Sequence, residues 1–403
     1  MPVLAAIGRP AAGRRRGVRV TLLLALGLAG ALLAGCASAS STGKPGGGDA
    51  EAPRPPSIAV DPPAGAVDVS PLAPVTVTVS DGTLDQVTVT SPEGTPVIGQ
   101  LDPEGTTWTP AEPLGYGMTY TVAATATGEG SKPFTTTSSF TTVVPRALAY
   151  PSMNPLDGET VGVGQPLAVY FDQRVENKQV AEEAIVVNAN PPVEGAFYWF
   201  TDSEVHWRPK DFWAPGTTIT MDINVYGKDL GNGVYGEENR RASVTIGDAV
   251  IARADGATHQ MTIEINGAVV RTMPISMGEP GFPSHNGIHV VTERHETKVM
   301  DSSTYGLQPT EGGYITEVRW ATRISNGGEF VHAAPWSVGD QGVRNVSHGC
   351  VNLSTENAKW FFDTVKKGDV VVQTNTGGAE LRPYDGFGDW QIPWGQWLSG
   401  GET

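Results

Sequence analysis

Apolar and polar residues alternate in short runs through the first half of the chain, from residue 58 to residue 249. Residues 75–79 and 86–90 have a period of two, and clusters of Pro, Gly and Asp separate such runs from one another. Successive side chains of a strand point to opposite faces, so this period predicts strands with one buried face. Many short strands with turn residues between them predict antiparallel sheets packed face to face.

The strand pattern occurs twice. The tripeptide WTP at 108–110 recurs as WRP at 207–209, and a Gly that leads into a strand follows each Trp by nine residues, at Gly117 and Gly216. An internal repeat of about 100 residues indicates a duplicated module. Neither copy holds the cysteine pair of antibody domains, so any likeness is one of architecture. We expect two immunoglobulin-like β-sandwiches that act as spacers, with the two Trp in their cores, at residues 58–145 and 146–249.

Residues 250–375 have a different pattern and contain six of the seven His. Residues 250–254, 260–266 and 268–273 predict successive strands, and the pair Asn266-Gly267 between the last two is a hairpin signal. We therefore expect this segment to form a third domain that is mainly β.

One short helix is predicted in this third domain, at residues 357–365, with Ser354 as its N-cap. The remaining residues, 376–403, form a tail with three closely spaced Trp. Pro393 limits any helix there to a short piece. Because exposing three indole rings to water is costly, we expect the tail to pack back on the body of the protein through Trp390, Trp394 and Trp397.

The N-terminus has the pattern of an export signal. Residues 1–35 carry five Arg and no acidic residue, and an apolar run occupies residues 20–33. The run ends in LAGC, which resembles the bacterial lipobox and implies lipidation of Cys36. Residues 36–57 are rich in Gly, Ser and Pro and predict a flexible tether. The expected location is the extracytoplasmic face of the membrane, in the cell wall or periplasmic space. An ordinary signal peptide and an uncleaved anchor are the alternatives.

The chain is acidic, with 27 Lys and Arg against 43 Asp and Glu and a net charge of −16. Such a charge argues against nucleic acid as a partner and against electrostatic docking on anionic lipid. Membrane attachment would therefore depend on the lipid anchor.

The second of the two cysteines is the strongest sign of chemistry. If Cys36 carries lipid, Cys350 is a lone thiol in an exported protein, and its neighbours read SHGCVN at 347–352. Imidazole and backbone amides can activate a thiol, and a Gly permits the tight turn that aims such amides. A second imidazole, His332, lies fifteen residues before Ser347. Spacing alone leaves open a buried, inert Cys.

The combination of His332, fourteen intervening residues and SHGCVN resembles the signature of the L,D-transpeptidase (YkuD-type) catalytic domain. The layout of signal, two immunoglobulin-like domains, catalytic domain and Trp-rich tail resembles the actinobacterial members. The resemblance implies that Cys350 is the nucleophile and that His332 is its general base. It also implies an oxyanion hole made by the backbone N–H groups of His348, Gly349 and Cys350, to which the hydroxyl of Tyr314 can contribute.

The same resemblance assigns supporting residues. Ser347, His348 and Asn352 would hold the loop geometry, and a lid at residues 296–319 would cover the substrate cleft. The substrate-binding set would be Tyr314, Tyr305, Met300, Trp336, Ser347 and Asn352. No metal, nucleotide or redox cofactor is implied, and no HxH or HExxH spacing suggests a metal site.

The implied reaction is transfer of a peptidoglycan tetrapeptide stem, with loss of D-alanine, to the diaminopimelate side-chain amine of a second stem, which gives a 3→3 cross-link. Carbapenem-type β-lactams would acylate Cys350. The alternatives are an L,D-carboxypeptidase that uses water as acceptor and an inactive wall-binding scaffold. One departure stands out, because several relatives have Ser directly after the catalytic His, where this chain has Ala333. A backbone carbonyl can orient His332 equally well, so we expect activity to survive, and the group that orients the imidazole is left open by the sequence.

Overall fold

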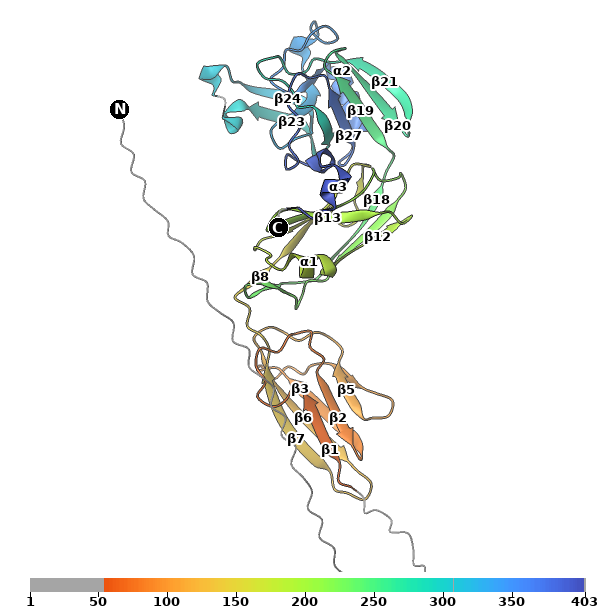
Figure 1. Ribbon diagram of the computed structural model, residues 1–403, viewed down its shortest axis with the longest axis vertical. Helices are drawn as coiled ribbons and strands as arrows, with labels where there is room; N and C mark the ends of the chain where they lie inside the picture. Colours follow the sequence, from red (N-terminus) through yellow and green to blue (C-terminus); the bar gives the residue numbers. More distant parts are fainter. Residues whose placement is uncertain (1–53, 307, 402–403) are drawn as a thin grey trace, which may run out of the picture. The chain divides into compact units, whose positions relative to one another are not determined.

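The computed structural model describes residues 54–306 and 308–401 (Figure 1). The chain is mainly β, as the alternating pattern predicts. Cys36 and the expected export signal lie outside the described residues. Within the part of the chain that the structure describes, no helix has the length and apolar character needed to cross a membrane.

The first region is a pair of facing sheets, with strand orders β1-β2-β5-β4 and β3-β6-β7. Residues buried between them include Val77, Val122 and Phe140, which alternate with more exposed neighbours as a period of two requires. The strands are β1 (Ser57–Asp61), β2 (Thr76–Ser80), β3 (Thr83–Thr90), β4 (Gly99–Leu101), β5 (Thr107–Pro110), β6 (Thr119–Thr127) and β7 (Phe134–Thr141).

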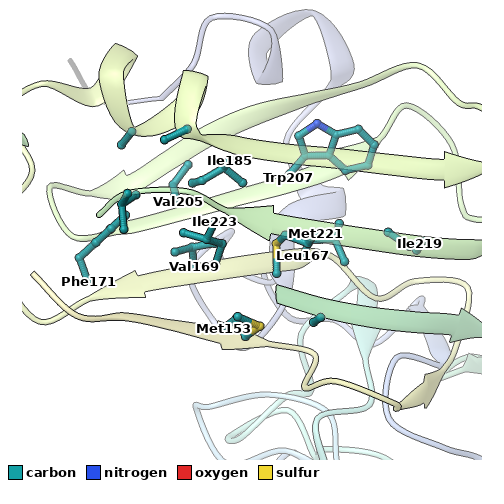
Figure 2. Close-up of a cluster of buried hydrophobic side chains, with 14 of the residues drawn as sticks. Met153, Leu167, Val169, Phe171, Ile185, Val205, Trp207, Ile219, Met221 and Ile223 are labelled. Carbon is teal, nitrogen blue, oxygen red and sulfur yellow. The ribbon is translucent and has the colours of Figure 1, made fainter. Parts of the chain in front are cut away.

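The second region contains two four-stranded sheets, β10-β18-β15-β12 and β13-β14-β11-β9, and a small sheet, β16-β17-β8. Figure 2 shows the apolar core between them, with Leu167, Val205 and Ile223 among its members. The elements are β8 (Ala147–Ala149), β9 (Pro151–Asn154), β10 (Thr160–Val161), β11 (Leu167–Phe171), α1 (Lys178–Ala184), β12 (Ile185–Asn190), β13 (Gly195–Thr201), β14 (Glu204–Pro209), β15 (Thr218–Ile223), β16 (Asp229–Gly231), β17 (Val234–Gly236) and β18 (Arg240–Ile246).

The repeated Trp residues have equivalent places in the two regions. Trp108 and Trp207 are buried, 5% and 9% exposed, as predicted. Each Trp lies two residues before a Pro, and that Pro pairs with a Gly on the neighbouring strand, at Gly99 and Gly195. A Cβ at either Gly would lie about 2 Å from the Trp ring, so only Gly leaves room for it. The two copies of the sequence repeat therefore share one packing arrangement, a Trp ring against a Gly of the neighbouring strand.

The third region, residues 250–375, is the one in which the sequence predicts the catalytic residues and is called the catalytic region below. It holds a five-stranded sheet, β21-β20-β19-β27-β22, and a four-stranded sheet, β23-β24-β25-β26. Its elements are β19 (Val250–Asp255), β20 (Gln260–Ile265), β21 (Ala268–Pro274), β22 (Gly287–Val290), β23 (Glu293–Asp301), η1 (Ser302–Tyr305), η2 (Pro309–Glu311), β24 (Ile315–Arg323), β25 (Phe330–Ala333), η3 (Pro335–Ser337), β26 (Val351–Leu353), α2 (Thr355–Thr364) and β27 (Val370–Thr374).

Local signals in the sequence account for this region. The predicted hairpin forms between β20 and β21, and both of its turn residues, Asn266 and Gly267, have positive φ, 50° and 81°. The predicted helix is α2, where the hydroxyl of Ser354 accepts a hydrogen bond from the backbone N–H of Asn357, as an N-cap should. Phe361 on α2 is fully buried in the core between this helix and the sheets.

The tail consists of η4 (Gly388–Gln391) and α3 (Trp394–Trp397). Its indole N–H groups donate to carbonyl oxygens of the second region, from Trp390 to Gly164 at 2.8 Å and from Trp397 to Ala196 at 2.9 Å. The guanidinium of Arg208 lies over the rings of Trp390, Trp394 and Trp397, with its carbon 4.4–5.4 Å from their centroids. Stacking of this kind ties the tail to β14.

Candidate active site

A cavity of about 300 Å³ in the catalytic region brings together eight of the ten residues predicted for the site. Gly349 belongs to the same loop, and the side chain of Tyr305 lies outside the described structure. Thr316 and Val346 also line the cavity, although the sequence analysis did not single them out. The eight predicted residues are Met300, Tyr314, His332, Trp336, Ser347, His348, Cys350 and Asn352.

Strand pairing explains why residues far apart in sequence meet here. β25 runs parallel to β26, and this register sets His332 beside Asn352. Cys350 immediately precedes β26, two residues before Asn352, so both cavity-lining side chains lie on the side that His332 faces. The hairpin of β23 and β24 pairs Met300 with Thr316 and contributes both to the cavity. The segment expected to form a lid, residues 296–319, falls within β23, β24 and the connection between them.

The loop that carries the nucleophile is held by short-range hydrogen bonds. The hydroxyl of Ser347 donates to the carbonyl of Cys350 at 2.6 Å and accepts from the N–H of Gly349 at 3.2 Å. Gly349 has φ of +114°, which favours glycine strongly. Because Ser347 already engages the N–H of Gly349, the amides of His348 and Cys350 are the better candidates for an oxyanion hole.

His332 is oriented by main chain. Its Nδ1 lies 2.9 Å from the carbonyl oxygen of Ala333, so Nδ1–H donates there and Nε2 keeps its lone pair. The question that the sequence left open is thus answered in the structure: a backbone carbonyl stands in for the side-chain hydroxyl that is absent at Ala333. Burial lowers the pKa of His332 to about 4, which keeps the imidazole neutral at physiological pH. A neutral imidazole with an unoccupied Nε2 is a competent proton acceptor.

The thiol of Cys350 is also neutral at rest. Burial raises its pKa to about 12, and the backbone N–H of Phe330 opposes the shift only in part. The thiol donates to the carbonyl oxygen of Gly328, with sulfur and oxygen 3.7 Å apart. The same burial disfavours both thiolate and imidazolium, so the resting pair is uncharged. Attack by the sulfur therefore requires that a base removes its proton as the new bond forms.

Aromatic rings shape the rest of the wall. His348 stacks on Phe282, with ring centroids 4.6 Å apart, and meets the edge of Tyr314 at 5.2 Å. Trp336 lies 6.2 Å from the ring of His332 and is 60% exposed at the mouth of the cavity. Phe282 supports His348 without lining the cavity itself. The sequence did not single it out, since a lone Phe between Pro and Gly residues gives no period from which to place it.

Immunoglobulin-like sheets followed by a domain with Cys350 and His332 in one cavity are the layout that the sequence resemblance implies for a cysteine acyltransferase. Comparison with protein families agrees. Residues 249–372 match the L,D-transpeptidase catalytic domain, called YkuD, and residues 66–229 match a bacterial Ig domain.

Individual relatives extend the match to most of the chain. The chain is 51% identical over 337 residues to L,D-transpeptidase 2 of Mycobacterium tuberculosis, which covers 83% of this chain and 82% of that one. It is 37% identical over 355 residues to L,D-transpeptidase 5 of the same organism, with 86% and 77% covered. A solved structure of the L,D-transpeptidase LdtMt1 in complex with imipenem superposes with a TM-score of 0.50 and 34% identity, over 57% of this chain and 100% of that one. The chain belongs to the L,D-transpeptidase family.

Proposed function

We propose that the protein forms 3→3 cross-links in peptidoglycan through a thioester on Cys350. The observation that carries this proposal is the pairing of a neutral thiol with a neutral, carbonyl-oriented imidazole, His332, in one cavity beneath a β-hairpin. Ser347 also lines the cavity, but its hydroxyl already donates to the carbonyl of Cys350, so the thiol is the better candidate nucleophile. The substrate class rests on membership of the family.

The first half-reaction makes the acyl-enzyme. Nε2 of His332 takes the thiol proton while the sulfur of Cys350 attacks the carbonyl carbon of the L-centre third residue of a tetrapeptide stem. The N–H groups of His348 and Cys350 face the oxyanion that develops. The C–N bond then breaks, His332 returns the proton to the amine, and D-alanine leaves.

The second half-reaction runs the same proton path in reverse. The side-chain amine of diaminopimelate in an acceptor stem attacks the thioester, and His332 accepts the proton that the amine loses. The C–S bond breaks, and the sulfur of Cys350 recovers a proton from His332. Exposure of Trp336 at the mouth is compatible with an acceptor that enters from solvent.

Incubation with purified tetrapeptide stems tests the proposal. Mass spectrometry should detect dimers joined 3→3 and, when labelled D-amino acid is added, exchanged stems. Tripeptide and free D-alanine alone would identify an L,D-carboxypeptidase instead. Cys350→Ala should give neither product. An unchanged yield from that variant would contradict the thioester mechanism altogether.

The relative solved with imipenem supports a second part of the proposal, that carbapenems acylate Cys350. The sulfur would open the β-lactam ring without a leaving group, so the protein should gain the full mass of the drug. A gain of mass that persists in Cys350→Ala would place the adduct elsewhere.

We also propose that lipid on Cys36 anchors the enzyme outside the cytoplasmic membrane. The motif that ends in this residue supports the proposal. Cys36→Ala should move the protein from the membrane fraction to the soluble fraction of cells. Retention by the apolar run alone would rule the lipid anchor out.

A further inference from the structure

Glu329 occupies an unusual position beside the nucleophile. It lies in the turn between β24 and β25, is 6% exposed, and separates the two residues whose backbones contact the sulfur of Cys350. The carbonyl of Gly328 accepts the thiol proton at 3.7 Å, and the N–H of Phe330 favours the charged sulfur. A shift of Glu329 would therefore move both contacts.

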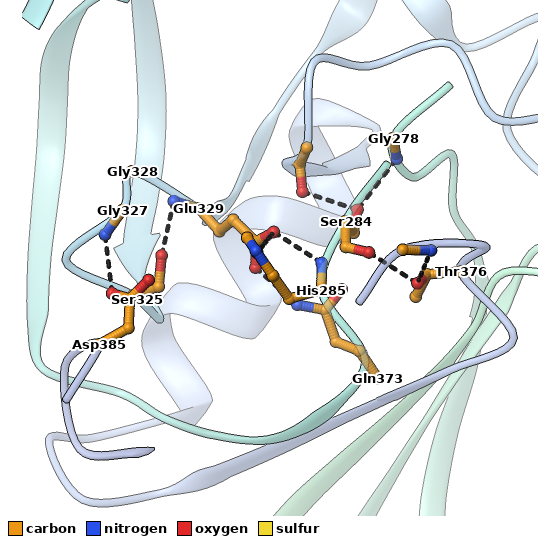
Figure 3. A network of polar contacts seen from close by, with 12 residues as sticks. Gly278, Ser284, His285, Ser325, Gly327, Gly328, Glu329, Gln373, Thr376 and Asp385 are labelled. Atoms are coloured by element: carbon orange, nitrogen blue, oxygen red, sulfur yellow. Dashed lines mark hydrogen bonds and ion pairs between the residues drawn. The ribbon is translucent and has the colours of Figure 1, made fainter. Parts of the chain in front are cut away.

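The carboxylate is anchored by partners from outside its own turn (Figure 3). Its Oε1 accepts from the backbone N–H of His285 at 2.8 Å and lies 2.9 Å from Nδ1 of the same residue. Its Oε2 accepts from Nε2 of Gln373 on β27 at 3.3 Å. Burying a carboxylate costs free energy unless such donors compensate for the lost hydration. An acidic residue at this position therefore indicates a role other than packing.

The turn itself is tied at two further points. The N–H of Glu329 donates to the hydroxyl of Ser325 at 3.0 Å, and the N–H of Gly327 donates to Asp385 of the tail at 2.7 Å. Figure 3 shows these bonds on one side of Glu329 and the His285 contacts on the other. The residues before and after Gly328 are thus both held by hydrogen bonds, which fixes the direction of the Gly328 carbonyl.

The same network reaches the nucleophile loop. Ser284, next to His285, donates from its hydroxyl to the carbonyl of Gly349 at 2.7 Å. A Cβ built on Gly349 would lie 3.8 Å from Oε1 of Glu329, so the carboxylate borders the loop directly. Cys350 follows Gly349 directly, and a negative charge close to a buried thiol disfavours its ionisation.

We propose that Glu329 is a positioning residue of the active site, which holds the Gly328 carbonyl and the Phe330 amide against Cys350, and that its negative charge beside the nucleophile loop makes ionisation of the buried thiol harder. This inference rests on the proposed function, because it takes Cys350 as the nucleophile. Thiolates are the form most open to oxidation, so a protonated resting thiol suits an enzyme exposed to oxidants.

Other charged groups around the carboxylate set the balance. Hydrogen bonding to Glu329 raises the pKa of His285, a shift that Asp385 supports and Arg382 opposes. Burial lowers the pKa of His289, whose Nδ1 is 3.6 Å from Oε2, so this imidazole stays neutral. Burial is the main cause that raises the pKa of Cys350; the charge of Glu329 adds to it, and that of Arg323 opposes it. His285 hydrogen-bonds the carboxylate directly and has a raised pKa, so it is the group that offsets the negative charge of Glu329 most closely.

Two variants with opposite expected signs test this. Iodoacetamide reacts with the thiolate and needs no recognition of a stem peptide. Because Cys350 is buried, access also affects the absolute rate, so the pH dependence of alkylation is followed on the peptide that carries Cys350 from pH 6 to pH 11 and reports its ionisation. Glu329→Gln removes the charge and should speed alkylation about tenfold below the thiol pKa, which corresponds to one pKa unit. His285→Gln leaves the charge unbalanced and should slow it. Glu356→Gln on α2, an acid whose side chain is 89% exposed, is the matched control and should change neither rate.

Turnover separates positioning from unfolding. Glu329→Gln should lower kcat by roughly tenfold or more, with KM unchanged, because the residue does not touch substrate. If Glu329→Gln is alkylated faster but has lost its melting transition, the variant has simply unfolded. The test then depends on His285→Gln, which should be alkylated more slowly than the wild type. Equal alkylation rates in wild type, Glu329→Gln and His285→Gln would overturn the inference. If the wild type forms no cross-links but the alkylation shifts appear, the proposed function fails and the electrostatic role of Glu329 stands.

Discussion

The core of the second region and the wall of the catalytic cavity are both buried, yet they use burial differently. Between the sheets of the second region, apolar side chains such as Leu167 and Ile223 exclude water, and their burial supplies stability. Around Cys350, polar and ionisable groups are buried, and their burial alters proton affinity: the imidazole becomes a weak base and the thiol a weak acid. The same physical cause gives stability in one place and reactivity in the other.

Two tryptophans provide the largest test of that difference. Trp207→Ala should destabilise the second region by about 3–5 kcal/mol, since it empties a packed site, with a lower melting temperature in calorimetry. Trp336 is 60% exposed, so Trp336→Ala should change the free energy of unfolding by only about 0.5 kcal/mol while slowing carbapenem acylation. A large fall in melting temperature in Trp336→Ala, or an unchanged melting temperature in Trp207→Ala, would contradict the difference proposed between the core and the cavity wall.

His206, a buried histidine of the second region, allows a test of whether a buried charge in that region stabilises the fold. Nδ1 of His206 lies 2.6 Å from Asp389 of the tail, and Nε2 lies 3.1 Å from Glu204. Burial alone would lower the pKa of His206, but the two carboxylates outweigh it and raise the pKa to about 9. This folded value exceeds the unfolded value of about 6.5, so the stabilisation is complete below pH 6.5 and disappears as pH rises through 9.

The expected loss is on the order of 3 kcal/mol between pH 6 and pH 10, seen as a fall in melting temperature. In His206→Gln that pH dependence should flatten. If wild type and variant lose stability in parallel over this range, another group carries the effect.

In the cavity, by contrast, pH should matter little near neutrality. With the His332 pKa near 4 and the thiol pKa near 12, both partners keep their reactive protonation state from pH 6 to pH 9. The rate of carbapenem acylation should vary by less than about threefold over that range, whereas an ordinary thiol would gain about tenfold per unit below its pKa of 8.5. Stopped-flow fluorescence can follow the reaction.

His332→Gln supplies the control for this profile. Without a base, attack must wait for the thiol to ionise, so acylation should become slow and rise steadily with pH. A steep rise already present in the wild type would mean that Cys350 reacts as a preformed thiolate.

The parts that could be predicted from sequence are those with a local or periodic cause. Strands with a period of two, the Asn266-Gly267 turn and the Ser354 cap all appear as expected. Helix α1 was not predicted, because its seven residues have no side-chain cap and bury only Ala181 and Ala184. Short helices of this kind form through tertiary contact rather than through their own sequence.

The supporting network of the site could not be predicted for a related reason. Cys350 and His332 stood out through a motif, but Glu329 contacts His285 and Gln373, which lie 44 residues away along the chain on either side. No period or short spacing joins such positions. The one available signal was an acidic residue placed directly before an apolar strand.

The smallest expected effect concerns Ala333, where relatives can carry Ser. Nδ1 of His332 already has a carbonyl acceptor at 2.9 Å, so a new hydroxyl in Ala333→Ser has no vacant role. Acylation should change by less than about threefold, and burying the unpartnered hydroxyl should cost roughly 1–3 kcal/mol of stability. Ala334→Ser, a fully buried neighbour, is the matched control for that stability cost. If acylation became tenfold faster or more in Ala333→Ser alone, the Ala333 carbonyl would not be enough to orient His332. A side-chain hydroxyl would then contribute to reactivity beyond what the hydrogen bond at 2.9 Å indicates.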